Sequence, residues 1–304
     1  MRLAGAVDIG GTGTKIGIVG EDGSIVTRAT IPTDPGAEPA ALVERIAATL
    51  EPMFDAIRAD GKALAGVGVA VAGFLDRKHS LMYGNANLAA LCGFPLRRAI
   101  GERAGMDCRL EVDSNAAVVA DQRHGAARGA TRALGITLGT GVGGGVIVNG
   151  QLLRFTGECA GDVGHIIIEP DGRSCVCGAR GCMEALVSAA ALSERGGGRP
   201  VSAIVASARA GDVAAREALG ETGRWLGRGL AALVPLFAPE RIVIGGGLSA
   251  AGELLLQPTR ASFAAHASPG FANGVTIAGS AFEGWAGVVG AGSLVLDPGE
   301  ESLA

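Results

Sequence analysis

The sequence has few lysines, few aromatic side chains and no long apolar run. Only Lys15, Lys62 and Lys78 among its 26 basic residues are lysines, and the formal net charge is −4. This scattered, slightly acidic charge pattern excludes a nucleic-acid surface as the main function. No segment approaches the ~18 consecutive apolar residues of a membrane span, and the opening MRLAGAVDIGG lacks the pattern of a secretory signal. We therefore expect a cytoplasmic protein without a nucleic-acid or membrane partner.

Cysteine is also scarce, whereas glycine is abundant. Six cysteines in 304 residues are too few for a disulfide scaffold, and three of them lie together at positions 175, 177 and 182. Glycine accounts for 51 of the 304 residues, roughly 17% where about 7% is usual. This content indicates many tight turns or ligand loops lined by backbone. A length near twice the roughly 150 residues of one domain predicts two domains.

The hydrophobic pattern predicts an α/β protein with an internal repeat. The first thirty residues are typical of three strands joined by tight turns, and residues 133–153 repeat the pattern of strand, Gly/Thr turn and strand. Predicted helices cover residues 42–57, 184–195, 201–210, 213–235 and 284–296. We interpret the chain as a small domain at 1–115 and a larger one at 116–283, with the C-terminal helix in 284–304 packing back on the first.

The segment DIGGTGTK at 8–15 lies between two predicted strands. Backbone N–H groups in a glycine turn can form a cradle for an anion, and glycine lets a phosphate approach the main chain. Threonine can add hydroxyls, Lys15 a positive charge, and Asp8 a water-mediated anchor for Mg²⁺. An ordinary glycine hairpin explains the same residues. The candidate phosphate-binding residues are Asp8, Gly10, Gly11, Thr12, Thr14 and Lys15.

A second glycine loop, LGTGVGGG, occupies 138–145. It contains the G-x-G-x-x-G spacing, but a strand follows where a dinucleotide site requires a helix. We therefore interpret Gly139, Thr140 and Gly141 as a second phosphate-binding loop. A third turn, Gly245–Gly247, follows another predicted strand, and ordinary hairpins do not readily explain three such turns in this order.

The segment from His165 to Cys182 carries one imidazole and three thiols within eighteen residues. His165, Cys175, Cys177 and Cys182 make a complete Cys₃His set for a structural, tetrahedral zinc ion. Buried cysteines without a metal are the weaker interpretation, because a Cys-x-Cys pair does not easily place both thiols in one apolar core.

Asp113 follows the predicted strand at 108–112 and precedes a helix. Its local sequence suits a helix N-cap, and its chemistry also suits a general base that accepts a hydroxyl proton during phosphoryl transfer. Asp162 and Glu184 are equally open to a structural or a ligand-binding role.

Taken together, the segments DIGGT, VDSNAA, GTGVGGG, GDVGH, CVCGARGCME and IVIGGG resemble the ROK family of sugar kinases, which includes glucokinases and N-acetylhexosamine kinases. That family belongs to the actin/hexokinase-like ATPase superfamily, so the resemblance implies a two-domain, ribonuclease H-like α/β fold with an ATP and sugar cleft between the domains. It also implies ATP and Mg²⁺ as cofactors, a structural Zn²⁺, a sugar or sugar-like acceptor, and a homodimer or homotetramer.

The resemblance also assigns roles to individual positions. It implies that Asp113 is the catalytic base, that Gly245, Gly246 and Gly247 contact adenosine, and that His165 both binds zinc and contacts the sugar. The sugar contacts that we carry over or expect are Gly73, Asn87, Asp113, Asp162, His165 and Glu184.

Two positions depart from the family pattern. Val112 stands where the residue before the catalytic aspartate is usually asparagine, and Asp162 stands where the pattern has glutamate. Valine cannot hydrogen-bond, so we expect an altered acceptor specificity, such as another hexose, a hexosamine or a cyclitol, with the phosphoryl-transfer chemistry kept.

Other functions remain open at this level. The family includes sugar-responsive repressors with a helix-turn-helix ahead of the kinase-like body, and here the first loop already begins at Asp8. A catalytically inactive binding protein would also keep the fold. An actin-type scaffold has no need of the zinc segment. The phosphoryl donor could be ATP, another nucleotide or polyphosphate.

Overall fold

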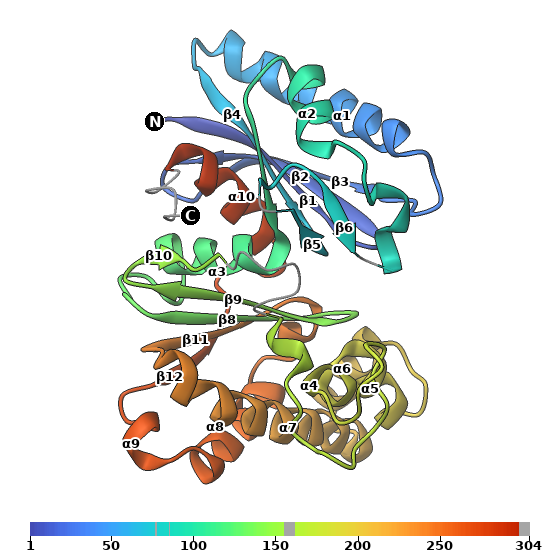
Figure 1. Cartoon of the computed structure of the whole chain (residues 1–304), viewed down its shortest axis with the longest axis vertical. Helices are drawn as coiled ribbons and strands as arrows, with labels where there is room; N and C mark the ends of the chain where they lie inside the picture. Colours follow the sequence, from blue (N-terminus) through green and yellow to red (C-terminus); the bar gives the residue numbers. More distant parts are fainter. Residues whose placement is uncertain (77, 85, 155–161, 298–304) are drawn as a thin grey trace. The chain divides into compact units, whose positions relative to one another are not determined.

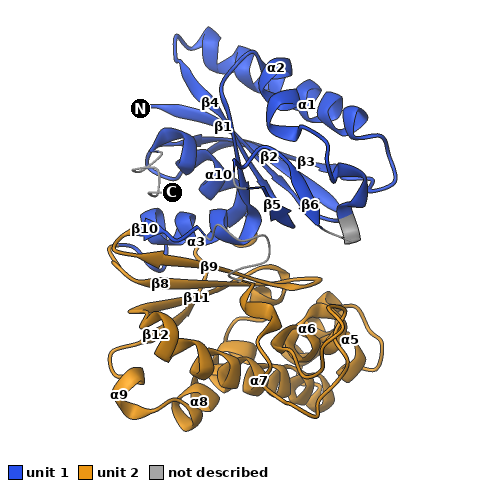
Figure 2. Cartoon of the chain, viewed as in Figure 1, with its two compact units in different colours: residues 1–128, 151–160, 285–304 blue, residues 129–150, 161–284 orange. Residues whose placement is uncertain are grey.

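The computed structural model describes residues 1–76, 78–84, 86–154 and 162–297 (Figure 1). The chain forms two compact α/β units (Figure 2). The first contains Met1–Arg128, Gln151–Ala160 and Trp285–Ala304, and the second contains Gly129–Gly150 and Gly161–Gly284. Among the described residues, no helix is both long and apolar enough to cross a lipid bilayer.

The first unit is built on a five-stranded sheet with the order β3-β2-β1-β4-β7. β1 (Leu3–Ile9) pairs antiparallel with β2 (Gly13–Gly20) and parallel with β4 (Leu64–Val71). β3 (Ile25–Pro32) extends the antiparallel edge, and β7 (Cys108–Val112) extends the parallel edge. The predicted antiparallel opening of the chain is therefore confirmed, and the parallel strands place their carboxyl ends at one edge of the sheet.

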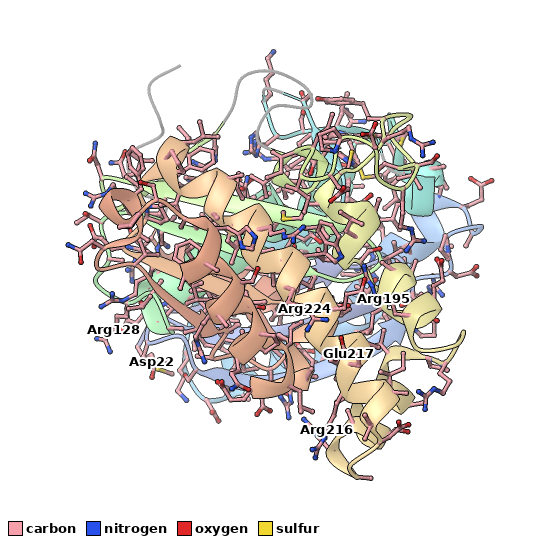
Figure 3. The ribbon with its side chains drawn as sticks, turned by 90° about the horizontal axis from the view of Figure 1, so that it is seen from below. Asp22, Arg128, Arg195, Arg216, Glu217 and Arg224 are labelled. Carbon is pink, nitrogen blue, oxygen red and sulfur yellow. The ribbon has the colours of Figure 1, made fainter. Side chains whose placement is uncertain are left out.

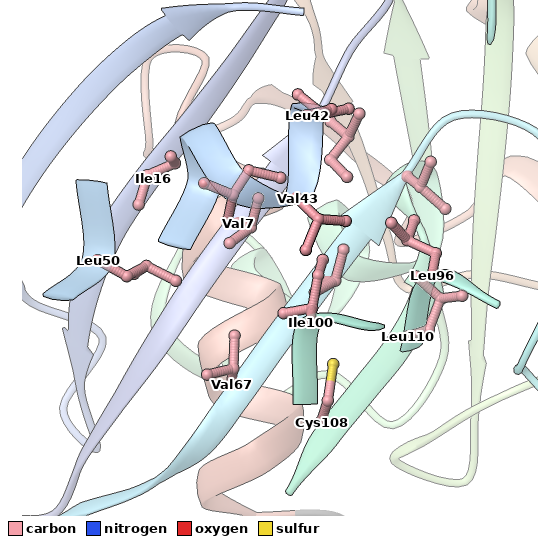
Figure 4. Packing of buried hydrophobic residues seen from close by; sticks show 14 of the residues in the cluster. Val7, Ile16, Leu42, Val43, Leu50, Val67, Leu96, Ile100, Cys108 and Leu110 are labelled. Carbon is pink, nitrogen blue, oxygen red and sulfur yellow. The ribbon is translucent and has the colours of Figure 1, made fainter. Parts of the chain in front are cut away.

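One face of this sheet is covered by α1 (Pro39–Ala59) and α2 (Leu96–Ala104). Large apolar side chains fill the interface, and β1 contributes Val7 and Ile9 to it (Figure 4). Because successive strand residues point to opposite faces, Ala6, which directly precedes Val7, belongs to a different cluster on the other side. Sequence analysis missed α2, whose nine residues give only a short periodic signal.

The opposite face is lined with small residues and carries α3 (Asp113–His124) and α10 (Ala286–Leu296). A Cβ on Gly68 of β4 would lie 1.9 Å from the carbonyl oxygen of Ala291. A Cβ on Gly290 would lie 1.7 Å from the carbonyl oxygen of Ala116 in α3. The main chain of α10 therefore rests directly on the sheet and on α3, at a distance that only glycine permits.

The second five-stranded sheet repeats this topology, with the order β10-β9-β8-β11-β12, and its strands β9, β8, β11 and β12 belong to the second unit. β8 pairs antiparallel with β9 and parallel with β11, just as β1 does with β2 and β4. The strands are β8 (Ala133–Leu138), β9 (Val142–Val148), β10 (Gln151–Leu152), β11 (Arg241–Gly245) and β12 (Thr276–Gly279). The shared strand order is the one that an internal duplication predicts. The topology of the two sheets agrees with the predicted α/β fold class.

The helices of the second unit lie beside this sheet, with α7 (Val213–Phe237) packed along α8 (Glu253–His266). The helix expected at 184–195 is in fact two, α4 (Met183–Val187) and α5 (Ala189–Arg195). They are separated at Ser188, whose hydroxyl caps α5 by accepting from the backbone N–H of Ala191. The remaining short elements are β5 (Phe74–Leu75), β6 (Met82–Gly84), η1 (Ala86–Leu91), η2 (Val163–His165), α6 (Val201–Arg209), η3 (Gly247–Ala251) and α9 (Pro269–Ala272).

The domain boundary expected near residue 115 remains a prediction of domain organisation. The compact units themselves divide after Arg128, because α3 packs on α10 and on β4 and β7 of the first sheet.

The close contact between α10 and α3 gives a test of the packing. We expect Gly290→Ala to lower the free energy of unfolding by about 2 kcal/mol or more, because a Cβ there collides with backbone that cannot move locally. Gly36→Ala is the matched control, since nothing lies within 4 Å of its added Cβ, and it should change stability by less than about 0.5 kcal/mol. Urea unfolding followed by circular dichroism measures both, and equal midpoints would contradict this packing.

Candidate active site

The first glycine loop joins β1 to β2 as a tight turn. The backbone N–H of Gly10 donates to the carbonyl of Gly13 over 3.1 Å, which closes the loop. The side chain of Thr12 is exposed, whereas Thr14 is fully buried and its hydroxyl lies 3.0 Å from the hydroxyl of Thr33. Thr12 and Thr14 were both expected to contact phosphate, but they occupy different environments, and of the two only Thr12 faces solvent.

Asp8 lies at the end of β1, opposite Lys15 on β2. Burial and the negative charge of Asp113 raise the pKa of Asp8 to about 7, and Lys15 acts in the opposite direction. The first turn of α10 also approaches this carboxyl, since a Cβ on Gly287 would lie 2.6 Å from the Asp8 carboxyl carbon. A carboxylate that is buried near a second one is a site where a cation lowers the electrostatic energy.

Lys15 also packs against a tryptophan at the start of α10. Its ammonium lies 5.8 Å from the ring centroid of Trp285, and the guanidinium of Arg28 lies 5.0 Å from the same ring. Cation–π contacts of this kind hold the lysine stem beside Asp8. The sequence around Lys15 gives no sign of this contact, because Trp285 follows Lys15 by 270 residues.

Asp113 is the first residue of α3, directly after β7 ends at Val112. Val112 occupies the N-cap position, so Asp113 is not the N-cap that the local sequence suggests. One Asp113 carboxylate oxygen accepts the backbone N–H of Ser114 over 2.7 Å. The strand-to-helix junction thus presents a carboxylate at the carboxyl edge of the parallel strands, where ligands bind in open α/β sheets.

A buried carboxylate, Glu111, supports this junction, and sequence analysis missed it. One of its oxygens accepts the backbone N–H of Val112 and the side-chain amide of Asn115, both over 3.0 Å. Its other oxygen accepts from Nε of Arg154 over 2.8 Å. A carboxylate that is only 3% exposed needs such partners, because a buried charge without them is very unfavourable.

The second glycine loop is held by Glu184. A carboxylate oxygen of Glu184 accepts the backbone N–H of Val142 over 2.9 Å, and a Cβ on Gly141 would lie 2.6 Å from that oxygen. The carbonyl of Gly139 accepts the backbone N–H of Ala189 at the start of α5, over 2.8 Å. Glu184 therefore fixes the loop that precedes β9, a role that its sequence position did not reveal.

The third glycine turn lies against the same loop. Gly246 has a φ of 80°, and a Cβ there would lie 2.4 Å from the carbonyl oxygen of Leu138. Only glycine allows both this backbone conformation and this close approach. Gly245 ends β11 and Gly247 begins η3, so the second and third predicted ligand loops are neighbours in the second unit.

The four predicted metal ligands form one cluster. The ligand atoms of His165, Cys175, Cys177 and Cys182 all lie within 4.8 Å of one another. The sulfur atoms of Cys177 and Cys182 are 3.6 Å apart, and Nδ1 of His165 lies 3.5 Å from the sulfur of Cys175. A tetrahedral metal about 2.3 Å from each sulfur places two sulfurs about 3.8 Å apart, so the cluster fits such an ion.

The cluster also faces a pair of carboxylates. The other ring nitrogen of His165, Nε2, lies 3.6 Å from a carboxylate oxygen of Asp162. Burial and the negative charge of Glu184 raise the pKa of Asp162, while His165 lowers it. Asp162, His165 and Glu184 are therefore close enough to interact electrostatically, as expected for residues of one site.

Arg195, at the end of α5 (Figure 3), connects α4, which carries Glu184, to α7. Arg195 donates to the carbonyl of Leu186 over 2.7 Å and to the hydroxyl of Thr222 in α7 over 3.1 Å, and it pairs with Glu221 over 3.0 Å. No sequence pattern predicts these contacts of Arg195, because arginines are common on the exposed faces of helices.

Two expected sugar contacts are placed only in part. Gly73 follows β4 with a φ of 127°, a conformation that favours glycine. The backbone of Asn87 lies in η1, but its side chain is outside the part of the chain that the structure describes.

These features define a two-domain α/β protein with paired five-stranded sheets, glycine loops and a Cys₃His cluster. The ROK family model matches residues 4–298. The glucokinase of Thermotoga maritima is 33% identical over 98% of this chain and 98% of its own length. The N-acetylmannosamine kinase of Escherichia fergusonii is 34% identical over 84% of this chain and 86% of its own length.

Structural comparison gives the same result. The crystal structure of a ROK family glucokinase from Streptomyces griseus, in complex with glucose and AMPPNP, has a TM-score of 0.84 and 33% sequence identity, over 96% of this chain and 98% of that one. The chain belongs to the ROK family. Both the resemblance and the actin/hexokinase-like fold class inferred from the sequence are confirmed.

Proposed function

We propose that this protein is an ATP-dependent kinase that phosphorylates a primary hydroxyl of a hexose or a sugar-like acceptor. Similarity to curated glucokinases over nearly the whole chain supports the kinase class. The structural observation that carries the proposal is Asp113, a carboxylate at the junction of β7 and α3, held by the Glu111 network. A general base of this kind is what phosphoryl transfer to an alcohol requires.

The proposed reaction follows from these groups. Asp113 accepts the proton of the acceptor hydroxyl while the oxygen of that hydroxyl attacks the γ-phosphorus of ATP. The bond from the γ-phosphorus to the bridging oxygen breaks, and ADP leaves with the bonding electrons. Each of the loops 8–15 and 138–145 offers backbone N–H groups to phosphate oxygens, and the turn 245–247 offers a contact to adenosine.

Magnesium fits the residues at the first loop. Asp8 is a partly buried carboxylate whose raised pKa reflects desolvation and the negative charge of Asp113, so a divalent cation nearby favours its ionised form. Mg²⁺ bound there through water would supply positive charge to the phosphates. Lys15, held against Trp285, adds a fixed positive charge beside Asp8.

Structural zinc fits the Cys₃His cluster by ligand type, number and spacing. With Nδ1 of His165 directed to the thiols, its Nε2 is directed to Asp162, so the cluster orients the imidazole as a candidate sugar contact. Glu184, two residues after Cys182, completes the candidate sugar-binding set in the second unit.

We infer that the acceptor differs from plain glucose or that glucose binds weakly. Val112 supplies a half-buried apolar side chain where the family pattern has an amide, and Asp162 is one methylene shorter than the glutamate of the pattern. A site that recognises substrate hydroxyls through hydrogen bonds strongly disfavours a substrate with which one of these bonds cannot form. Candidate acceptors are another hexose epimer, an N-acylated hexosamine or a cyclitol.

The second candidate is a sugar-binding or nucleotide-binding protein without turnover, including a regulator that lacks a DNA-binding domain. Val112 is the observation that favours it, because one expected hydroxyl contact is missing. ATP is the proposed donor, with other nucleotides and polyphosphate as alternatives. Homo-oligomerisation and a cytoplasmic location remain predictions.

Acceptor-dependent ADP release tests the kinase proposal. With Mg·ATP and a panel of glucose, mannose, allose, glucosamine, N-acetylhexosamines and a C7-cyclitol, we expect turnover on at least one acceptor. Asp113→Asn should lower kcat roughly 10²–10⁴-fold, because a general base contributes about that much. Asp107→Asn, an exposed aspartate at the other end of β7, should keep wild-type turnover. Absence of turnover on every acceptor, with nucleotide still bound, would favour the second candidate.

Metal content tests the cluster. We expect about one zinc ion per chain by mass spectrometry of the purified protein, and a lower thermal midpoint after chelation, because a structural zinc ion contributes directly to folding free energy. Cys182→Ser should lose the metal. Cys92→Ser, at an exposed cysteine outside the cluster, should retain it. Equal zinc content in the two variants would contradict the assignment.

Restoring the family pattern tests the acceptor inference. Val112→Asn combined with Asp162→Glu should raise kcat/KM for glucose roughly fivefold or more, because one regained hydrogen bond to a substrate hydroxyl is worth about 1 kcal/mol or more. Val26→Asn, at an exposed valine on β3, serves as the control and should leave kcat/KM unchanged. No gain on glucose in the double variant would count against the inference.

A further inference from the structure

Thr33 makes four hydrogen-bonding contacts that bind the first glycine loop to the rest of its unit. It stands directly after β3, twenty-three residues beyond Gly10. Its hydroxyl donates to the carbonyl of Gly10 over 2.7 Å and lies 3.0 Å from the hydroxyl of Thr14. Its backbone N–H donates to the carbonyl of Thr12 over 3.3 Å, and its own carbonyl accepts from Arg45 over 2.8 Å.

These contacts lie in a dry environment. Thr33 is 1% exposed and Thr14 is 0% exposed, so water cannot replace a hydrogen bond that is removed there. Arg45 belongs to α1, whose apolar face forms the main core of the first unit. The loop is therefore connected through Thr33 to the helix that packs on the main core of this unit.

The direction of these bonds bears on anion binding. In a trans peptide the C=O of one residue and the N–H of the next point in opposite directions, and the described chain contains no cis peptide bond. The carbonyls of Gly10 and Thr12 are both held toward Thr33. The N–H groups of Gly11 and Gly13 consequently point away from Thr33, an orientation that leaves them available to an anion on the other side of the loop.

We propose that Thr33 is a positioning residue for the phosphoryl donor. It holds the peptide groups of the first loop in the orientation that binds phosphate, and it does so without touching the nucleotide itself. The same contact explains why the hydroxyl of Thr14 is directed inward, so that Thr14 supports the loop and Thr12 is the threonine left facing solvent. This inference rests on the proposed kinase function for the identity of the ligand.

Nucleotide binding and steady-state kinetics test the proposal together. Thr33→Val keeps the side-chain shape and removes the hydroxyl. We expect it to raise the Kd for Mg·AMPPNP, measured by calorimetry, and the KM for ATP by roughly threefold to tenfold, with the KM for the acceptor within about twofold of wild type. Thr33→Ser keeps the hydroxyl and should restore binding close to wild type. Thr30→Val, at an exposed threonine on the preceding strand β3, is the matched control.

The outcomes separate the two proposals. An unchanged Kd in a folded Thr33→Val protein, or an equal rise in the KM of donor and acceptor, would overturn the positioning role. If Thr33→Val does not fold, Arg45→Met decides in the same calorimetric assay, because it removes the donor to the Thr33 carbonyl and keeps the aliphatic stem; an unchanged Kd there would also overturn the proposal. Failure of the kinase function itself would appear as absent turnover in the wild-type protein, whatever the effect of the variants on nucleotide binding.

Discussion

The contact between the main chain of α10 and the first sheet is the constraint on which the first unit depends. Gly68 and Gly290 remove the side chains that would separate the helix from β4 and α3. This close packing of α10 brings the C-terminal helix next to the N-terminal strands. The first turn of α10 therefore lies beside Asp8, and Trp285 lies beside Lys15. Part of the high glycine content therefore serves helix packing as well as ligand loops, and the packing also shapes the environment of a candidate magnesium anchor.

The second unit is organised by a continuous run of contacts that begins at the Cys₃His cluster. Cys182 is the last residue of the cluster and also the N-cap of α4, so Glu184 lies only two residues beyond the cluster. Glu184 in turn holds the backbone of the second glycine loop at Val142. Because Glu184 lies so near the cluster and bonds to the second glycine loop, we expect a metal in the cluster to help position both Glu184 and that loop, in addition to any effect on stability.

Local patterns in the sequence were sufficient for the features whose partners are near in the chain. The antiparallel opening, its repeat at β8 and β9, and the four-residue cluster all depend on short spacings. What the sequence did not reveal depends on distant partners: Glu111 meets Arg154 forty-three residues away, and Thr33 meets Gly10 across a whole hairpin. The break at Ser188 was missed for a different reason, since the apolar periodicity of α4 continues into α5 and only a hydroxyl cap interrupts it.

The geometry around Val112 bears on what its substitution changes. Its backbone N–H is held by Glu111 over 3.0 Å, and its φ of −67° and ψ of 140° are those of an ordinary helix N-cap. The valine side chain is therefore not accompanied by any distortion of the peptide that leads into Asp113. Asparagine at this position would leave the same backbone bonds in place, because none of them involves the side chain. We therefore expect the departure from the family pattern to change acceptor recognition beside the proposed base while the backbone that positions the base stays the same.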